Sequence, residues 1–391
     1  MVYTADEWQQ YHQSKDKQMK KDAIIEKKLG FPCRLHAAID EAKEENLRPK
    51  RFLLKIKNKL LELLFENWYV DDDIDESKGL NCDRDTEAEV ELAIRFFPNV
   101  LSKKRNGRYL IYYQLRSRNG GANLKAMPFI PLLAKLAIEL NQFFTVEERG
   151  GLTDVDADGS SNSVFVGLAD MCYVSARRSD DDNEKYQQLV DDTSLMVMAQ
   201  LRENGLFRKE DISEYDLMWL LCRQRIFPEQ RFRYLADWYP GSLMLPTEGG
   251  ALPFQLATWY CQDIRGFRTF LEVGIHHFPK EMGCLFHRDR HGGTAYRLAC
   301  RKHGNNEVKK LLDDGFRKNH TNISTLLKSL VYACSDETVH LEGVFEILQR
   351  VLQKEPSVLF QVQAATSRNV NINNMKNDGN SHKRKRGGQY V

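Results

Sequence analysis

The sequence lacks any apolar run of the roughly 18 residues that a membrane-spanning helix needs. Its first residues, MVYTADEWQQYHQSKDKQMKK, also lack the apolar segment that marks a secretory signal. These two absences exclude a membrane span and predict a protein of the cytoplasm or the nucleus.

The cysteines show no spacing typical of disulfide or metal-binding motifs. The eight cysteines are scattered, with no C-x-x-C pair and no zinc-ligand spacing. We expect reduced thiols in the core, and neither a disulfide framework nor a metal site.

Neither sign of charge dominates, because 57 Lys and Arg against 55 Asp and Glu leave a net charge of +2. So small an excess does not attract nucleic acid to the chain as a whole. The phosphate-binding and nucleophile motifs G-x-S-x-G, Walker A and G-x-G-x-x-G are also missing. We therefore expect a protein that is not an enzyme, with no cofactor and no small-molecule substrate.

Three stretches resemble parts of functional motifs, but each lacks a residue that the motif requires. The stretch DVDADGSSNSVF begins like a calcium loop but has Phe165 where a bidentate glutamate is needed. His287-Arg288-Asp289 spells the kinase triplet, yet Thr294 stands where that motif requires asparagine. Four histidines lie close together in sequence without a ligand pair on one helix face, and we interpret them as surface residues: His276, His277, His287 and His291.

The most informative stretch is GGTAYRLACRKHGNNEVKKLLDDG, residues 292–315. Thr294 has the position of a helix N-cap, and Gly304 can end that helix after about two turns. Apolar residues then recur at helical spacing up to Gly315, which we expect to be a second C-terminal cap. The stretch predicts a hairpin of two short helices, which must stack on neighbours of the same kind to bury its apolar side.

With Asp289, this stretch follows the order D-x-x-G-x-T-x-x-x-x-A and resembles an ankyrin repeat. The usual T-P-L-H is replaced by Thr294-Ala295-Tyr296-Arg297, so both the proline and the histidine that ties adjacent repeats together are missing. The resemblance implies a stack of helical hairpins that binds other proteins.

The pattern recurs along the chain. Residues 250–257 align with residues 292–299 and restore the proline, and residues 107–114 form a weaker copy. The weaker copy is followed by MPFIPLLAKLAIEL, in which Pro128 and Pro131 can open a helix. An aromatic–proline pair precedes each copy: Phe97-Pro98, Tyr239-Pro240 and Phe278-Pro279. Two degenerate units are expected between them, around SVFVGLADMCYVSA and YDLMWLLCRQRIFPEQRFRYLADWYP.

These features predict an all-α fold, an α-solenoid of ankyrin-like hairpins with helical caps at both ends and a disordered C-terminal tail. The tail contains a basic run that resembles a nuclear import signal: Lys383, Arg384, Lys385 and Arg386. The predicted parts are a charged helical arm (1–48), a basic amphipathic helix and acidic linker (49–84), the repeat array (85–318), a helical cap (319–360) and the basic tail (361–391).

The helix expected near residues 49–68 carries an apolar stripe that includes Leu53 and Ile56, and crowds lysines onto its other positions. Such a helix can lie on a membrane or bind a partner, and we favour a terminal helix packed on the array. Residues 31–39 faintly resemble the opening of an F-box, which would make the chain, through a divergent F-box near residues 31–65, a substrate-recognition subunit of a ubiquitin ligase.

We expect a scaffold or adaptor that holds a protein or peptide on the concave face of the array. Linker tips and first helices are free to specify the partner, and their side chains here are mainly basic, so an acidic partner is predicted. The candidate residues are Lys103, Lys104, Arg105, Tyr112, Gln255, Arg288, Arg290, His291 and Arg297. The alternatives are the ligase subunit, an enzyme with an unrecognised site, and a nuclear protein that binds nucleic acid through its basic tail.

Overall fold

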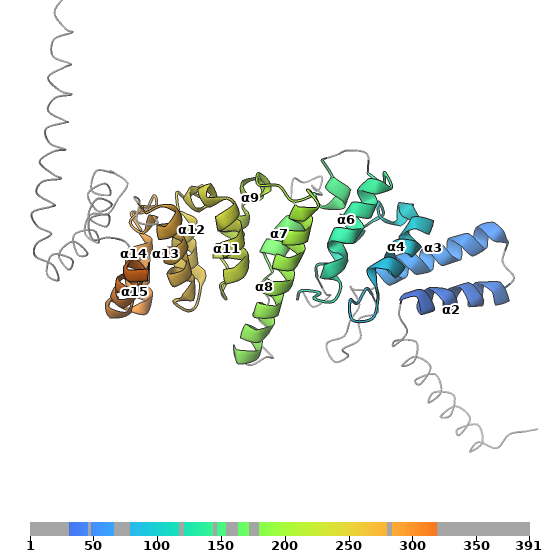
Figure 1. The fold of residues 1–391 in the computed structure, drawn as a ribbon, viewed down its shortest axis with the longest axis horizontal. Coiled ribbons are helices and arrows are strands. Elements are labelled where there is room, and N and C mark those ends of the chain that lie inside the picture. Colours follow the sequence, from blue (N-terminus) through green and yellow to red (C-terminus); the bar gives the residue numbers. More distant parts are fainter. Residues whose placement is uncertain are drawn as a thin grey trace, which may run out of the picture. The chain divides into compact units, whose positions relative to one another are not determined.

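The computed structural model describes residues 31–45, 48–65, 79–116, 121–143, 147–153, 163–171, 180–279 and 284–318 (Figure 1). This part of the chain is mostly helical, which confirms the all-α prediction. Its only strands are the two-residue pair β1 (Lys104–Arg105) and β2 (Arg108–Tyr109). The predicted cap (319–360), the basic tail with residues 383–386 and the arm before residue 31 lie outside the described residues.

The chain divides into two compact units, Met1–Leu220 and Leu221–Val391. The boundary falls inside the helix α10 (Leu217–Cys222), within the stretch that the sequence predicts as a single array. We call the two parts unit 1 and unit 2. No described helix is long and apolar enough to pass through a lipid bilayer.

Unit 1 begins with a helical hairpin made of α2 (Phe31–Glu44) and α3 (Pro49–Phe65). The side chains of Ala42 and Ile56 are buried between the two helices, with Leu35 and Ile39 packed against them. Helix α3 thus packs on α2, and it also contacts η2 (Pro98–Val100) and α5 (Leu110–Tyr113). One position of its stripe is wrong, because Leu53 is 54% exposed. The buried residues of α3 lie in its C-terminal part: Ile56, Leu60, Leu63, Leu64 and Phe65.

The next helix, α4 (Glu87–Phe96), starts at a capping box in which the Thr86 hydroxyl accepts from the Glu89 amide. It ends before the short turn η2 (Pro98–Val100), after which β1 and β2 pair in a hairpin. The short α5 (Leu110–Tyr113) follows, and η3 (Met127–Phe129) leads into α6 (Ile130–Glu139). A proline stands in the first turn of each of these last two helices, as the sequence predicts.

Unit 1 continues through η4 (Arg149–Gly151), α7 (Val164–Ala169), α8 (Asp180–Glu203) and α9 (Asp211–Glu214). Helix α5 contacts α6 and α7, while α8 contacts both α6 and α7. The short helices α5 and α7 therefore pair with the longer helices α6 and α8 that follow them, and the two pairs contact each other. The stretch SVFVGLADMCYVSA, predicted from sequence as a degenerate unit, contains α7.

Unit 2 contains α11 (Glu229–Trp238), η5 (Pro240–Met244), α12 (Pro253–Tyr260), α13 (Arg265–His277), α14 (Ala295–His303) and α15 (Asn305–Lys318). Helix α12 pairs with α13 and α14 pairs with α15, while α12 contacts α14 and α13 contacts both α11 and α15. The core between the pairs is aromatic: the rings of Phe254 and Phe270 stack with centroids 4.4 Å apart, and Phe232 and Phe267 pack beside them.

Local chemistry sets the ends of these helices. The Thr294 hydroxyl accepts from the Arg297 amide at 3.2 Å, and α14 stops before Gly304, whose φ of 89° suits only glycine well. The aromatic residue of each aromatic–proline pair lies directly after the last residue of a helix. The three share nearly the same backbone conformation, with φ/ψ of −132/61° at Phe97, −134/77° at Tyr239 and −127/62° at Phe278. Proline explains this, because its ring clashes with a helical residue before it.

The prediction that Gly315 caps a helix is wrong. Helix α15 runs through Gly315 to Lys318, and α13 likewise runs through Gly274. A glycine inside a helix costs only about 1 kcal/mol relative to alanine, which packing can offset. What ends α13 is the aromatic–proline pair after it.

Candidate interaction surfaces

The Gln255 side chain connects two helical pairs instead of facing solvent. It is 2% exposed, and its Nε2 donates to the carbonyls of His287 at 3.0 Å and Gly293 at 2.8 Å. Its Oε1 accepts from the Leu252 amide at 2.6 Å. The expectation that Gln255 is exposed for a partner is therefore wrong. The sequence alignment could have predicted this burial. Gln255 aligns with Arg297, the position at which the resembling ankyrin motif has its tying histidine.

The turn before α14 is built on Asp289. Its Oδ1 accepts from the amides of His291 at 2.9 Å and Gly293 at 2.7 Å, the pattern of an aspartate that holds a turn. The Arg290 amide also donates to the carbonyl of Gly249 in the preceding turn, at 3.4 Å. Arg290 and His291 are exposed at the tip, whereas Arg288 is half-buried.

Helices α12 and α14 are joined at their C-terminal ends by Lys302. Its Nζ donates to the carbonyls of Trp259 at 2.9 Å and Thr258 at 3.1 Å, and also to Cys261. These are the carbonyls that a helix end leaves without partners of its own, so Lys302 acts as a C-cap from a neighbouring helix. Partial burial lowers the pKa of Lys302 from its usual value.

Beside this joint lies an aromatic pair that the sequence analysis missed. Trp259 is 59% exposed and Tyr260 is 49% exposed, at the end of α12. Arg297 and Arg301, one helical turn apart on the adjacent α14, are exposed too. We call these four residues the α12–α14 face. The spacing of the apolar residues could have predicted this exposure. Phe254 and Ala257 occupy the buried side of α12, and Trp259 lies outside the core.

The remaining predicted residues belong to unit 1. Lys103 and Lys104 are exposed around the β1–β2 hairpin, and Arg105 and Tyr112 are half-exposed. Of the residues predicted from sequence, Lys103, Lys104, Arg105 and Tyr112 lie in unit 1, and Gln255, Arg288, Arg290, His291 and Arg297 lie in unit 2.

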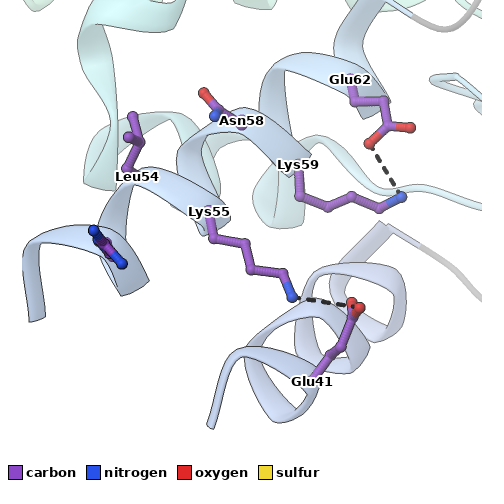
Figure 2. A pocket seen from close by; sticks show the side chains of 7 residues that line it. Glu41, Leu54, Lys55, Asn58, Lys59 and Glu62 are labelled. Atoms are coloured by element: carbon purple, nitrogen blue, oxygen red, sulfur yellow. Dashed lines mark ion pairs between the residues drawn. The ribbon is translucent and has the colours of Figure 1, made fainter. Parts of the chain in front are cut away.

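A shallow groove of about 430 Å³ lies along α3, where it faces α2 (Figure 2). Its cations are mostly paired: Lys55 Nζ lies 2.7 Å from Glu45 and 3.3 Å from Glu41, and Lys59 lies 3.3 Å from Glu62. The hydrogen bond to Glu45 raises the pKa of Lys55 above its usual value. The Lys55 pairs join α3 to Glu41 in α2 and to Glu45 just after it, whereas the Lys59–Glu62 pair lies within α3. Arg51, Leu54 and Asn58 also line the groove.

One buried ion pair of unit 1, Arg149–Asp211, forms a clasp. Arg149 donates to both carboxylate oxygens of Asp211, at 2.6 and 2.7 Å, and Asp211 also accepts from the Arg208 amide. Desolvation raises the pKa of the neighbouring Tyr215 to about 12. The clasp holds η4 against the start of α9, and its geometry is that of a structural ion pair.

The described residues contain no group of three or more His, Cys, Asp or Glu side chains placed to hold a metal ion. Of the histidines considered from sequence, His277 pairs with Asp237 at 3.0 Å, and its ring meets that of His276 edge to face. Comparison with protein-family models, curated proteins and solved structures gave no match.

Proposed function

We propose that this chain is a non-catalytic interaction scaffold made of ankyrin-like helical pairs, and that its α12–α14 face binds an acidic segment of a partner protein. The observation that carries the proposal is an exposed tryptophan and tyrosine beside two exposed arginines on adjacent helices. Trp, Tyr and Arg are the residues that dominate binding energy at protein interfaces.

The contact pattern within each unit supports the ankyrin-like array. Short helices contact the next short helix and longer helices contact the next longer one, in unit 1 and in unit 2. The Gln255 bridge and the bond between the Arg290 amide and Gly249 tie successive pairs at their turns. A stack of this kind presents first helices and turn tips side by side, which is where a scaffold holds its partner.

The face is suited to binding because its backbone is fixed before a partner arrives. Lys302 holds the end of α12 against α14, so little backbone freedom is left to lose on association. Aromatic rings contribute contact area with few rotatable bonds, and guanidinium groups recognise carboxylates bidentately. Arg297 and Arg301 on this face therefore favour an acidic segment.

The test uses the full chain as bait, with proteins captured from a cell lysate and identified by mass spectrometry. The test variants are Trp259→Ala and Arg301→Glu, and the matched controls are Leu245→Ala and Arg268→Glu, exposed residues elsewhere in unit 2. We expect a specific protein with an acidic segment to be retained by both controls and lost from both test variants. Retention by the test variants would rule out this face as the binding site.

Of the alternatives, the ligase subunit has one supporting observation in the described residues. The α2–α3 hairpin exposes Leu53 and Leu54, at 54% and 57%, and an F-box-like hairpin would use such residues to reach a ligase adaptor. Loss of a captured ligase adaptor in a Leu53→Ser/Leu54→Ser variant would favour that function. A nucleic-acid-binding role for residues 383–386 predicts binding to DNA or RNA that weakens steeply with salt and needs the tail.

A further inference from the structure

Positive charge is concentrated along α3. Residues 48–61 contain no carboxylate, and six of their side chains are cations: Arg48, Lys50, Arg51, Lys55, Lys57 and Lys59. Two of the six are paired, because Lys55 contacts Glu41 and Glu45 and Lys59 contacts Glu62. Across the described part of the chain, no ion pair engages Lys50, Arg51 or Lys57.

Two of these cations share a face of α3 with two leucines. Lys50, Leu53, Leu54 and Lys57 stand at positions i, i+3, i+4 and i+7, which a helix brings onto one stripe. Leu53 is 54% exposed and Leu54 is 57% exposed, with Lys50 and Arg51 exposed beside them and Lys57 half-exposed. We call these five residues the exposed α3 face.

The packing of the hairpin leaves this face uncovered. Phe52 packs against the cluster of Ala42 and Ile56, between α2 and α3. Figure 2 shows Lys55 pointing toward Glu41 on α2, whereas Leu54 points to the other side of α3. The contact between α2 and α3 therefore accounts for the side of the helix that carries Phe52 and Ile56, and not for its exposed leucines.

Leucines set between cations suit the surface of an anionic bilayer. There, apolar side chains enter the boundary between headgroups and acyl chains, while lysine and arginine bury their stems and keep their charges at the lipid phosphates. A nucleic-acid backbone would engage the cations but gains little from two leucines. The combination of both residue types on one face therefore favours a lipid surface.

We propose that the exposed α3 face docks on an anionic membrane surface. Leu53 and Leu54 enter the headgroup boundary, and Lys50, Arg51 and Lys57 bind the lipid headgroups. So small an apolar contact gives weak, reversible binding and not a permanent anchor. The face lies in unit 1 and is independent of the α12–α14 face of unit 2.

The test measures how much of the full chain sediments with lipid vesicles. Vesicles of equal parts phosphatidylcholine and phosphatidylserine are compared with vesicles of phosphatidylcholine alone. We expect binding on the order of tenfold tighter to the anionic vesicles, because each cation near such a surface contributes to the attraction.

Two double variants test the two kinds of contact separately. Leu53→Ser/Leu54→Ser removes the apolar contact and should weaken binding to the anionic vesicles on the order of tenfold. Lys50→Glu/Arg51→Glu reverses two charges and should weaken it on the order of tenfold or more. Circular dichroism of each variant checks that the fold is kept.

Matched controls change the same residue types elsewhere. Leu92→Ser alters a leucine of α4 that is 61% exposed, and Lys135→Glu/Lys310→Glu reverses two exposed charges on α6 and α15. Both controls should bind the vesicles as the unsubstituted chain does. The assay contains no other protein, so a loss in the leucine variant is distinct from the loss of a ligase adaptor.

Several outcomes would overturn the proposal. Equal binding to the two kinds of vesicle would do so, as would undiminished binding by either α3 variant or an equal loss in the controls. If the chain binds single-stranded DNA and not vesicles, and the leucine variant binds that DNA undiminished, the cations belong to a nucleic-acid site instead.

Discussion

The side-chain amide of Gln255 donates to the main-chain carbonyl of Gly293, 2.8 Å away in the turn of the next helical pair. The same side chain accepts from the Leu252 amide, which otherwise lies unpaired at the start of α12. One residue therefore satisfies polar backbone groups in two successive pairs, and this makes unit 2 sensitive to its loss.

Gln255→Ala should destabilise unit 2 by about 1–3 kcal/mol, because it leaves buried backbone groups without partners. Urea denaturation of the full chain, followed by tryptophan fluorescence, measures the change. The exposed Gln262→Ala on the neighbouring loop is the control and should change stability little. Equal behaviour of the two variants would mean that the bridge contributes nothing.

Asp211→Ala should be more damaging, by about 3–5 kcal/mol, because it leaves the guanidinium of Arg149 buried without its carboxylate. The Arg149 side chain is 11% exposed and that of Asp211 1%. Glu139→Ala is the matched control, since it breaks the surface pair with Arg95, in which the side chains are 45% and 39% exposed. An exposed pair contributes about 0–1 kcal/mol, so thermal unfolding should separate the two variants clearly.

The stability of the chain should fall as pH rises from 10 toward 12, partly because of Tyr215. Its pKa is raised from 10.0 to about 12 by burial, so the unfolded state loses this proton first. The stabilising contribution is complete below pH 10 and is lost as pH rises through the folded pKa. Tyr215→Phe should flatten this part of the profile, measured by urea denaturation at several pH values. Tyr260→Phe, at an exposed position, should leave the profile as it is; a Tyr215→Phe profile as steep as that of the unsubstituted chain would contradict the prediction.

Lys302→Met should loosen the end of α12 while keeping the length of the side chain. It removes the charge-assisted hydrogen bonds to the carbonyls of Thr258, Trp259 and Cys261, at a cost of roughly 1–3 kcal/mol. Hydrogen exchange should show faster exchange at the C-terminal end of α12. Arg301→Met removes a neighbouring exposed charge without removing the cap, and exchange there should not change.

Much of the local structure was predictable because short-range chemistry decides it. The Thr294 cap, the Asp289 turn, the prolines opening α6 and the aromatic–proline helix ends each depend on residues a few positions apart. Such features are present in the sequence itself.

Other features depend on contacts between distant residues and were missed. Gln255 is buried because a turn some 38 residues later supplies its acceptors. Leu53 is exposed because α2 packs on another side of α3, and Gly315 stays helical because a glycine alone is a weak stop. The exposure of Trp259 and the division into two units likewise depend on packing that a single sequence does not specify.

The shared conformation of Phe97, Tyr239 and Phe278 has a consequence for how such a chain can change in length. Each of these residues sends the backbone out of its helix at nearly the same angle, and each is followed by a proline that fixes the next step. Because these three helix ends have the same backbone geometry, the segment that follows one of them could follow another. We therefore expect duplication of the segment between Tyr239 and Phe278, which contains α12 and α13, to reproduce the same backbone junction at each end.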